Sequence, residues 1–207
     1  MRCKIDDFIC GSYFHFYNRT LDQHLLFYDE DDYELFLDLF KYNVKKYSAS
    51  VFAYCLMPNH FHFLLRQDSD EKLYHIFNYV LIAYVQRYNK KYGRKGPLFQ
   101  SPLQHKLVSN QEYLIQLCKY IHINPVKARL VKYPKDWIYS NYLEWIKLRT
   151  GTLFAKEIHS DYFPHPEDYI SMISTYKQYL PIKDFKRLLM DDKEEKLASS
   201  FLYEFTP

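Results

Sequence analysis

In the first third of the chain, the spacing of apolar residues fits a strand in some segments and a helix in others. Residues 12–18 alternate weakly and predict a first strand. Residues 51–57 form a continuous apolar run of strand length, and residues 60–67 alternate. Pro58 and Asn59 between them are a turn signal, so these two strands are expected to form a hairpin.

Three longer stretches predict amphipathic helices, because their apolar residues recur every three or four positions. They cover residues 31–47, 71–92 and 111–123. Asn110 or Ser109 can cap the third helix, and Pro125 is expected to end it nearby. Residues 96–108 are expected to form a loop that runs into a strand. The order β-α-β-β-α-β-α predicts an α+β fold with a mainly antiparallel sheet and helices on one face.

The pattern changes past residue 150. Residues 151–165 read as irregular, and two further helical patterns follow at residues 167–179 and 185–205. We therefore expect one domain in residues 1–150 and a C-terminal helical extension in residues 151–207, whose task the pattern does not reveal.

Composition excludes several classes of protein. With 48% hydrophobic and 26% charged residues among 207, the chain is neither disordered nor collagen-like. Its densest apolar run, residues 79–85, is too short for a membrane helix, and the N-terminus lacks the apolar core of a secretory signal. The four cysteines show no C-x-x-C spacing, which argues against a zinc knuckle or a redox pair. A cytoplasmic protein without a membrane partner is expected.

Basic and aromatic residues gather in one short stretch, although the net charge is only +3. The basic members are Arg87, Lys90, Lys91, Arg94 and Lys95. Tyr88 and Tyr92 are interleaved with them, in a chain whose aromatic content is 19%. Two interpretations stay open: a solvated helix end favoured by the helix dipole, or a surface that follows a single-stranded nucleic acid.

Two histidines separated by one residue are the first candidates for chemistry. On a strand, His60 and His62 point to the same face while Phe61 turns into the core. Two neutral imidazoles on one face are suitable ligands for a divalent ion. The alternative is a pair of half-exposed strand histidines without a ligand.

A second candidate group lies on the third predicted helix. Tyr120 and Asn124 are four residues apart and share a helix face. A tyrosine with a reference pKa of about 10 needs a nearby metal or base to attack phosphorus, and an amide oxygen suits Mg²⁺ or Mn²⁺. The alternatives are a packed tyrosine and a helix C-cap asparagine. His122 lies on another face and reads as structural or surface.

The run AYCLMPNHFHFLL, residues 53–65, resembles the motif of the single-tyrosine HUH transposases, in particular the REP-associated tyrosine transposase group. HUH stands for histidine, a bulky hydrophobic residue and histidine. The similarity extends in order and spacing over residues 12–145. Its other segments are FYNR (16–19), FYDEDDYELFL (27–37), RYNKKYGRKGPLFQ (87–100) and EYLIQLCKYIHINPVKARLVKYPKDWIYSNY (112–142).

The resemblance implies a ferredoxin-like sheet with flanking helices that acts on single-stranded DNA bearing a small hairpin. It implies that Tyr120 is the nucleophile and that His60, His62 and Asn124 bind a divalent metal, Mg²⁺ or Mn²⁺. The expected products are a 5′-phosphotyrosine link and a free 3′-hydroxyl. Lys127 and Arg129, with the basic stretch, are expected to hold flanking phosphates. Monomer and homodimer both stay open.

The sequence departs from the pattern of the group in three places. Thr20 stands where relatives have glycine after N-R, and Arg129 stands in place of the glycine of A-G-L-V. The segment after LFQ reads Ser101-Pro102-Leu103 instead of G-R-F, so an arginine is missing. None of the four expected active-site positions is altered. Two alternatives to strand transfer stay open: a catalytically silent module that binds hairpin DNA or RNA, and a metal phosphodiesterase without a covalent intermediate.

Overall fold

The computed structural model describes residues 9–151, 153, 162–163 and 165–176. Four strands form one sheet in the order β2-β3-β1-β4, and every neighbouring pair is antiparallel. The strands are β1 (Tyr13–Arg19), β2 (Ala49–Met57), β3 (His60–Gln67) and β4 (Gln104–Leu107). The predicted hairpin of β2 and β3 is confirmed, as are the α+β class and the ferredoxin-like sheet.

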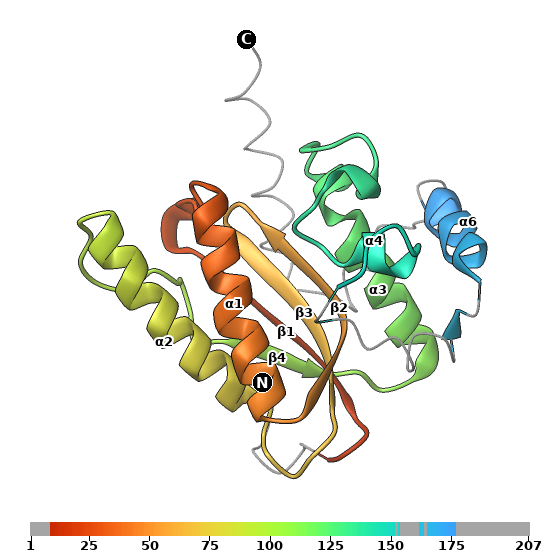
Figure 1. Cartoon of the computed structure of the whole chain (residues 1–207), viewed down its shortest axis with the longest axis horizontal. Helices are drawn as coiled ribbons and strands as arrows, with labels where there is room; N and C mark the ends of the chain where they lie inside the picture. Colours follow the sequence, from red (N-terminus) through yellow and green to blue (C-terminus); the bar gives the residue numbers. More distant parts are fainter. Residues whose placement is uncertain (1–8, 152, 154–161, 164, 177–207) are drawn as a thin grey trace.

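Helices cover both faces of this sheet (Figure 1). On one face lie α1 (Glu30–Lys46) and α2 (Tyr74–Lys91), and on the other lies α3 (Gln111–Lys127). The short helix α4 (Tyr142–Trp145) and α6 (Pro166–Tyr176) pack on the same side as α3; Leu21–Gln23 and Pro134–Asp136 are 3₁₀ turns. The expectation of helices on one face is therefore wrong. The continuous apolar run of β2 is the reason, since a strand that is apolar on both faces is buried on both.

The core between the sheet, α1 and α2 is rich in aromatic rings. Phe61, as predicted, turns into this core together with Phe63. The Phe40 and Phe63 ring centroids are 4.0 Å apart, and Phe61 stacks with Phe77 at 5.9 Å. These contacts join β3 to both helices, so the opposite face of β3 is held in a fixed position.

The second core, between the sheet and α3, includes a bulge in β2. The pairing with β3 shifts register between Val51 and Ala53, which frees the Phe52 carbonyl from the ladder. The side chains of Asn141 and Trp145 each donate to this carbonyl, at 3.0 Å. The bulge is thus one of the points where the segment after α3 is attached to β2.

The third helix is longer than its sequence predicts. It continues through Pro125 to Lys127, so the predicted end near residue 123 and the C-cap interpretation of Asn124 are both wrong. Proline removes one backbone donor, but it lies in the last turn, where few bonds depend on it. Beyond the C-cap Ala128, Arg129 N donates to Val126 O at 3.1 Å and Leu130 N donates to Pro125 O at 2.9 Å. This pair of bonds is a Schellman motif.

Arg129 occupies the position of that motif where glycine is favoured, with φ of +56°. We expect Arg129→Gly to raise the free energy of unfolding by about 1 kcal/mol, because it removes the strain of a left-handed residue with a side chain. Arg129→Ala removes the same charge but keeps that strain, so it should not stabilise the protein. Urea denaturation of the two variants measures the difference, and equal stabilities would contradict this explanation.

The C-terminal region is described in part. The helix expected at residues 167–179 is seen as Pro166–Tyr176, whereas the pattern at residues 185–205 lies outside the described residues. Tyr169 and Ile173 of α6 are buried in the second core. The domain boundary near residue 150 stays a prediction. Across the part of the chain that is described, no helix is long and apolar enough to cross a membrane.

Candidate active site

The sheet face that looks toward α3 carries a row of polar side chains. In the antiparallel pairing of β1 with β3, Tyr17 lies opposite His62 and Arg19 lies opposite His60. Directly opposed residues share a face of the sheet, so all four side chains lie on one side. The His60 and His62 ring centroids are 5.1 Å apart, which is the convergence that the H-x-H spacing predicts.

Each of these two histidines has a partner on Nδ1. The Nδ1 of His60 lies 2.6 Å from Asn59 Oδ1, and the Nδ1 of His62 lies 3.0 Å from His15 Nε2. An amide oxygen only accepts, so Nδ1 of His60 donates and its Nε2 keeps a lone pair. The Nε2 of His62 is buried without a hydrogen-bond partner in the described residues. A histidine held by one ring nitrogen, with the other nitrogen bare, is prepared to bind a metal ion.

Both imidazoles are neutral near neutral pH. Burial lowers the pKa of His60 well below its ordinary value and that of His62 to about 3. The positive charge of Arg19 lowers both further. Metal ligation requires the neutral ring, so no proton has to leave before an ion binds.

Helix α3 brings Tyr120 to this face. Its ring meets that of His62 edge-on, with centroids 5.4 Å apart, and its side chain is half-buried. Asn124 follows one helical turn later on the same face of α3 and is buried. Its Nδ2 has no hydrogen-bond partner within the described part of the chain. Tyr120 of α3 therefore contacts His62 of β3, and Asn124 lies on the same face of that helix.

Lys127, in the last turn of α3, lies close to the Tyr120 ring. Its ammonium group lies 5.2 Å from the centre of the Tyr120 ring, and desolvation lowers its pKa below the ordinary value. A cation at this place stabilises negative charge that develops on the phenolic oxygen.

The protein donors available to a metal ion here are neutral. Among the described residues, no group of three histidine, cysteine, aspartate or glutamate side chains is arranged to hold a metal. His60 and His62 supply two nitrogens, and the amide oxygen of Asn124 is the protein donor suited to complete the set. Neutral donors would leave the charge of a divalent ion uncompensated, so such an ion would attract phosphate oxygens.

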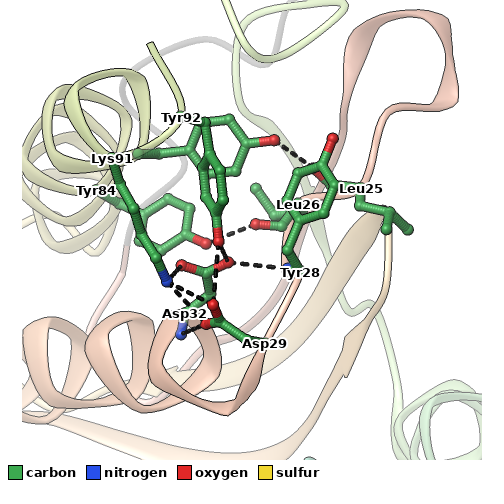
Figure 2. Close-up of polar contacts among 9 residues, drawn as sticks. Leu25, Leu26, Tyr28, Asp29, Asp32, Tyr84, Lys91 and Tyr92 are labelled. Atoms are coloured by element: carbon green, nitrogen blue, oxygen red, sulfur yellow. Dashed lines mark hydrogen bonds and ion pairs between the residues drawn. The ribbon is translucent and has the colours of Figure 1, made fainter. Parts of the chain in front are cut away.

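The basic stretch lies elsewhere, at the C-terminal end of α2, and one of its members is already paired. Lys91 contacts carboxylate oxygens of Asp29 at 2.8 Å and of Asp32 at 2.9 Å, as Figure 2 shows. The Tyr92 hydroxyl donates to Asp32 at 2.7 Å. Because Asp29 caps the start of α1, Lys91 and Tyr92 join the end of α2 to the start of α1.

The other members of the stretch differ in exposure. The Arg94 guanidinium lies over the Tyr88 ring at 5.7 Å. The exposed side chains are Arg87, Lys90 and Lys95. The chain that follows returns along the end of β1, where Gln100 N donates to Arg19 O at 3.1 Å. The stretch is thus connected to the strand end that carries Arg19, although it belongs to the opposite side of the sheet from Tyr120.

A buried network on the other face of α3 holds this helix in place. The ring of His122 lies between Asn141 Oδ1, at 2.9 Å, and the Tyr169 hydroxyl, at 2.6 Å. Asn141 Oδ1 also accepts from Tyr54 N at 2.7 Å. The structural interpretation of His122 is therefore correct. The network connects β2, α3 and α6, so it sets how Tyr120 faces the sheet.

Sequence reasoning missed His15, Arg19, Asn59 and Asn141. His15 and Arg19 lie two residues on either side of Tyr17, so the strand period that paired His60 with His62 predicts their common face as well. Asn141 had no comparable signal, because its partners are distant in the sequence.

The buried histidines also make the folded protein sensitive to acid. Burial lowers the pKa of His15, His60 and His62, so the unfolded chain binds more protons than the folded one once the pH falls below about 6.5. We expect the free energy of unfolding to fall from about pH 7 to pH 5, by roughly 1 kcal/mol per pH unit for each histidine. Urea denaturation in a chelating buffer measures this, and a flat profile would contradict the burial of neutral rings.

Comparisons with known proteins show the family and the fold of the chain. Residues 9–124, more than half of the chain, match the family model described as IS200-like transposase. A Haemophilus influenzae protein named as a REP-associated tyrosine transposase is 27% identical over 152 residues, which cover 68% of this chain and 85% of that protein. A solved REP-associated tyrosine transposase bound to a REP hairpin has the same fold, with a TM-score of 0.59 and 16% identity over 74% of this chain and 97% of that one. The chain belongs to the IS200-like transposase family.

Proposed function

We propose that this transposase cleaves and rejoins single-stranded DNA through a covalent bond to Tyr120. The observation that carries the proposal is the contact between Tyr120 and His62, whose bare Nε2 is directed away from its His15 partner. A nucleophile beside a neutral imidazole pair is the arrangement that metal-assisted attack on phosphorus requires.

In this reaction the Tyr120 hydroxyl attacks the phosphorus of a DNA backbone phosphate. A bond forms between the phenolic oxygen and phosphorus, and the bond from phosphorus to the 3′ oxygen breaks. The phenolic proton is lost and the leaving oxygen takes one up, so the products are a 5′-phosphotyrosine and a free 3′-hydroxyl. One phosphodiester replaces another, so attack by a 3′-hydroxyl rejoins DNA without an external energy source.

His60, His62 and Asn124 would hold a divalent ion, Mg²⁺ or Mn²⁺. Their donor set fits such an ion, because His62 Nε2 is buried and unpaired and its ring is neutral. When bound, the ion polarises the phosphate and stabilises the charge of the transition state. Because the ring of Tyr120 contacts that of His62, an ion held there would lie near the attacking hydroxyl.

The DNA partner that we propose is a single strand with a small hairpin. The related structure bound to a REP hairpin supports this choice, as do the exposed cations of the chain. Lys127 and Arg129 follow Tyr120 at the end of α3, and Arg87, Lys90 and Lys95 are further exposed cations at and beyond the end of α2.

A strand-polarity assay tests this function. The protein is incubated with hairpin-bearing single strands from the flanks of its own gene, labelled at either the 5′ or the 3′ end, with Mn²⁺, Mg²⁺ or a chelator. We expect a metal-dependent, denaturant-resistant adduct with the 3′-labelled strand only, and a 5′-labelled product that a polymerase can extend. A cleaved strand without an adduct would indicate hydrolysis instead, and bound but uncleaved DNA would indicate a binding module.

A further inference from the structure

We propose that Arg19 binds the scissile phosphate in the active site, where its guanidinium donates hydrogen bonds to nonbridging phosphate oxygens beside the ion held by His60 and His62. This role rests on the proposed strand transfer and adds a residue to it. Arg19 is a catalytic residue in this proposal, because it touches the group that reacts.

Hydrogen bonds of the backbone at residues 19 and 20 fix the position of Arg19. It is the last residue of β1 and lies directly opposite His60 in the pairing with β3. Its N–H donates to Asn18 Oδ1 at 2.9 Å, and its carbonyl accepts from Gln100 at 3.1 Å. The next residue, Thr20, donates its N–H to Asn59 O at 3.0 Å. The strand end is thus held beside the two metal-binding histidines.

The guanidinium of Arg19 lacks the partner that a structural arginine has. Within the described residues it forms no ion pair with a carboxylate, and its Nε is buried without a hydrogen-bond partner. Arg66 and Arg149, by contrast, direct Nε to Asp68 at 2.5 Å and to Glu144 at 2.7 Å. Leaving a partly buried cation unpaired is costly, so Arg19 is expected to receive an anion from outside the chain.

Arg19 lies close to the place that the scissile phosphate must occupy. It lies directly opposite His60, two residues along β3 from His62, whose imidazole contacts Tyr120. A divalent ion held by His60 and His62 would add its charge to that of Arg19, whereas the proposed protein ligands are neutral. A site of this kind would attract an anion.

A phosphodiester is the anion that fits this chemistry. The guanidinium presents a planar set of N–H donors that matches two phosphate oxygens, and its charge persists at any working pH. Negative charge accumulates on the nonbridging oxygens as the phenolic oxygen attacks, so these hydrogen bonds strengthen in the transition state. Removing Arg19 should therefore slow the chemical step more than it weakens DNA binding.

The test uses the full chain and hairpin DNA that forms an adduct with the wild type. We expect Arg19→Gln to reduce the single-turnover rate of adduct formation about 100-fold while the dissociation constant of the hairpin changes less than about threefold. Arg19→Lys keeps the charge without the planar donors and should lose about tenfold. Arg66→Gln, which removes an arginine from the other end of β3, is the matched control and should react like the wild type.

Mn²⁺ titration of the free protein separates this role from structural support of the metal site. Arg19→Gln should bind Mn²⁺ as tightly as the wild type or more tightly, because a nearby positive charge has been removed. Weaker Mn²⁺ binding, or adduct formation within threefold of the wild type, would overturn the role of Arg19 and leave strand transfer intact. A wild type that holds the hairpin but forms no adduct would overturn both proposals.

Discussion

Replacing Tyr120 with phenylalanine is expected to abolish the covalent protein–DNA adduct and to slow strand cleavage at least ~1000-fold. Phenylalanine keeps the ring that meets His62 edge-on and lies under the Lys127 ammonium group, so the packing of α3 should not change. The hydroxyl oxygen is the only atom that differs, and it is the atom that forms the bond to phosphorus. Hairpin binding should stay within about threefold of the wild type, measured by fluorescence anisotropy.

Tyr113→Phe is the matched control for this prediction. Tyr113 lies two turns earlier on α3, is buried in the same core, and loses the same atom. Its adduct yield should equal that of the wild type. An adduct that persists in Tyr120→Phe, or that disappears equally in Tyr113→Phe, would remove Tyr120 from its proposed role.

The second large effect is expected from His62→Ala. The variant loses a buried nitrogen without a protein partner, so Mn²⁺ affinity should fall at least ~100-fold and adduct formation should become undetectable at moderate metal concentrations. The ring that is lost is neutral at working pH, because burial lowers the pKa of His62 to about 3, and the neutral imidazole is the form that binds a metal ion. Calorimetric titration with Mn²⁺ measures the loss directly.

His24→Ala provides the control for His62→Ala, because His24 is exposed and lies outside the site. Its Mn²⁺ affinity and adduct yield should not change. If His62→Ala binds Mn²⁺ like the wild type, the ion lies elsewhere and the proposed ligand set is wrong.

The periodicities of the sequence predict most of the helices and strands but not how they pack. Residues 51–57 were correctly predicted as a strand from a continuous apolar run, and the same run meant that both faces of β2 are buried. Burial of both faces of β2 is what places α3 on the other face of the sheet from α1 and α2. The end of α3 was missed because a local rule about Pro125 was weaker than the Schellman bonds beyond it.

The candidate site could be predicted in pieces. Strand period joins His60 to His62 and helix period joins Tyr120 to Asn124, but neither shows that the two pairs meet. Their meeting depends on the tertiary packing of α3, which buried contacts of His122 and Asn141 hold in place.

The basic stretch shows the limit of reasoning from charge alone. Lys91 looked equivalent to its neighbours, yet it pairs with Asp29 and Asp32, about sixty residues earlier in the chain. Arg19 belongs to no cluster of basic residues, so charge alone did not single it out, although it lies beside the two histidines. Contacts between segments distant in sequence decide which cations are already paired.

Identification of the amino acid that carries the DNA is the most direct test of the central claim. The denatured adduct is digested with nuclease and trypsin, and the peptides are analysed by mass spectrometry. Cleavage after Lys119 and Lys127 releases residues 120–127, YIHINPVK, in which Tyr120 is the sole tyrosine. We predict that this peptide carries a nucleotide through its phosphate. A nucleotide on any other peptide, or a metal-dependent cleavage product with no modified peptide, would contradict nucleophilic attack by Tyr120.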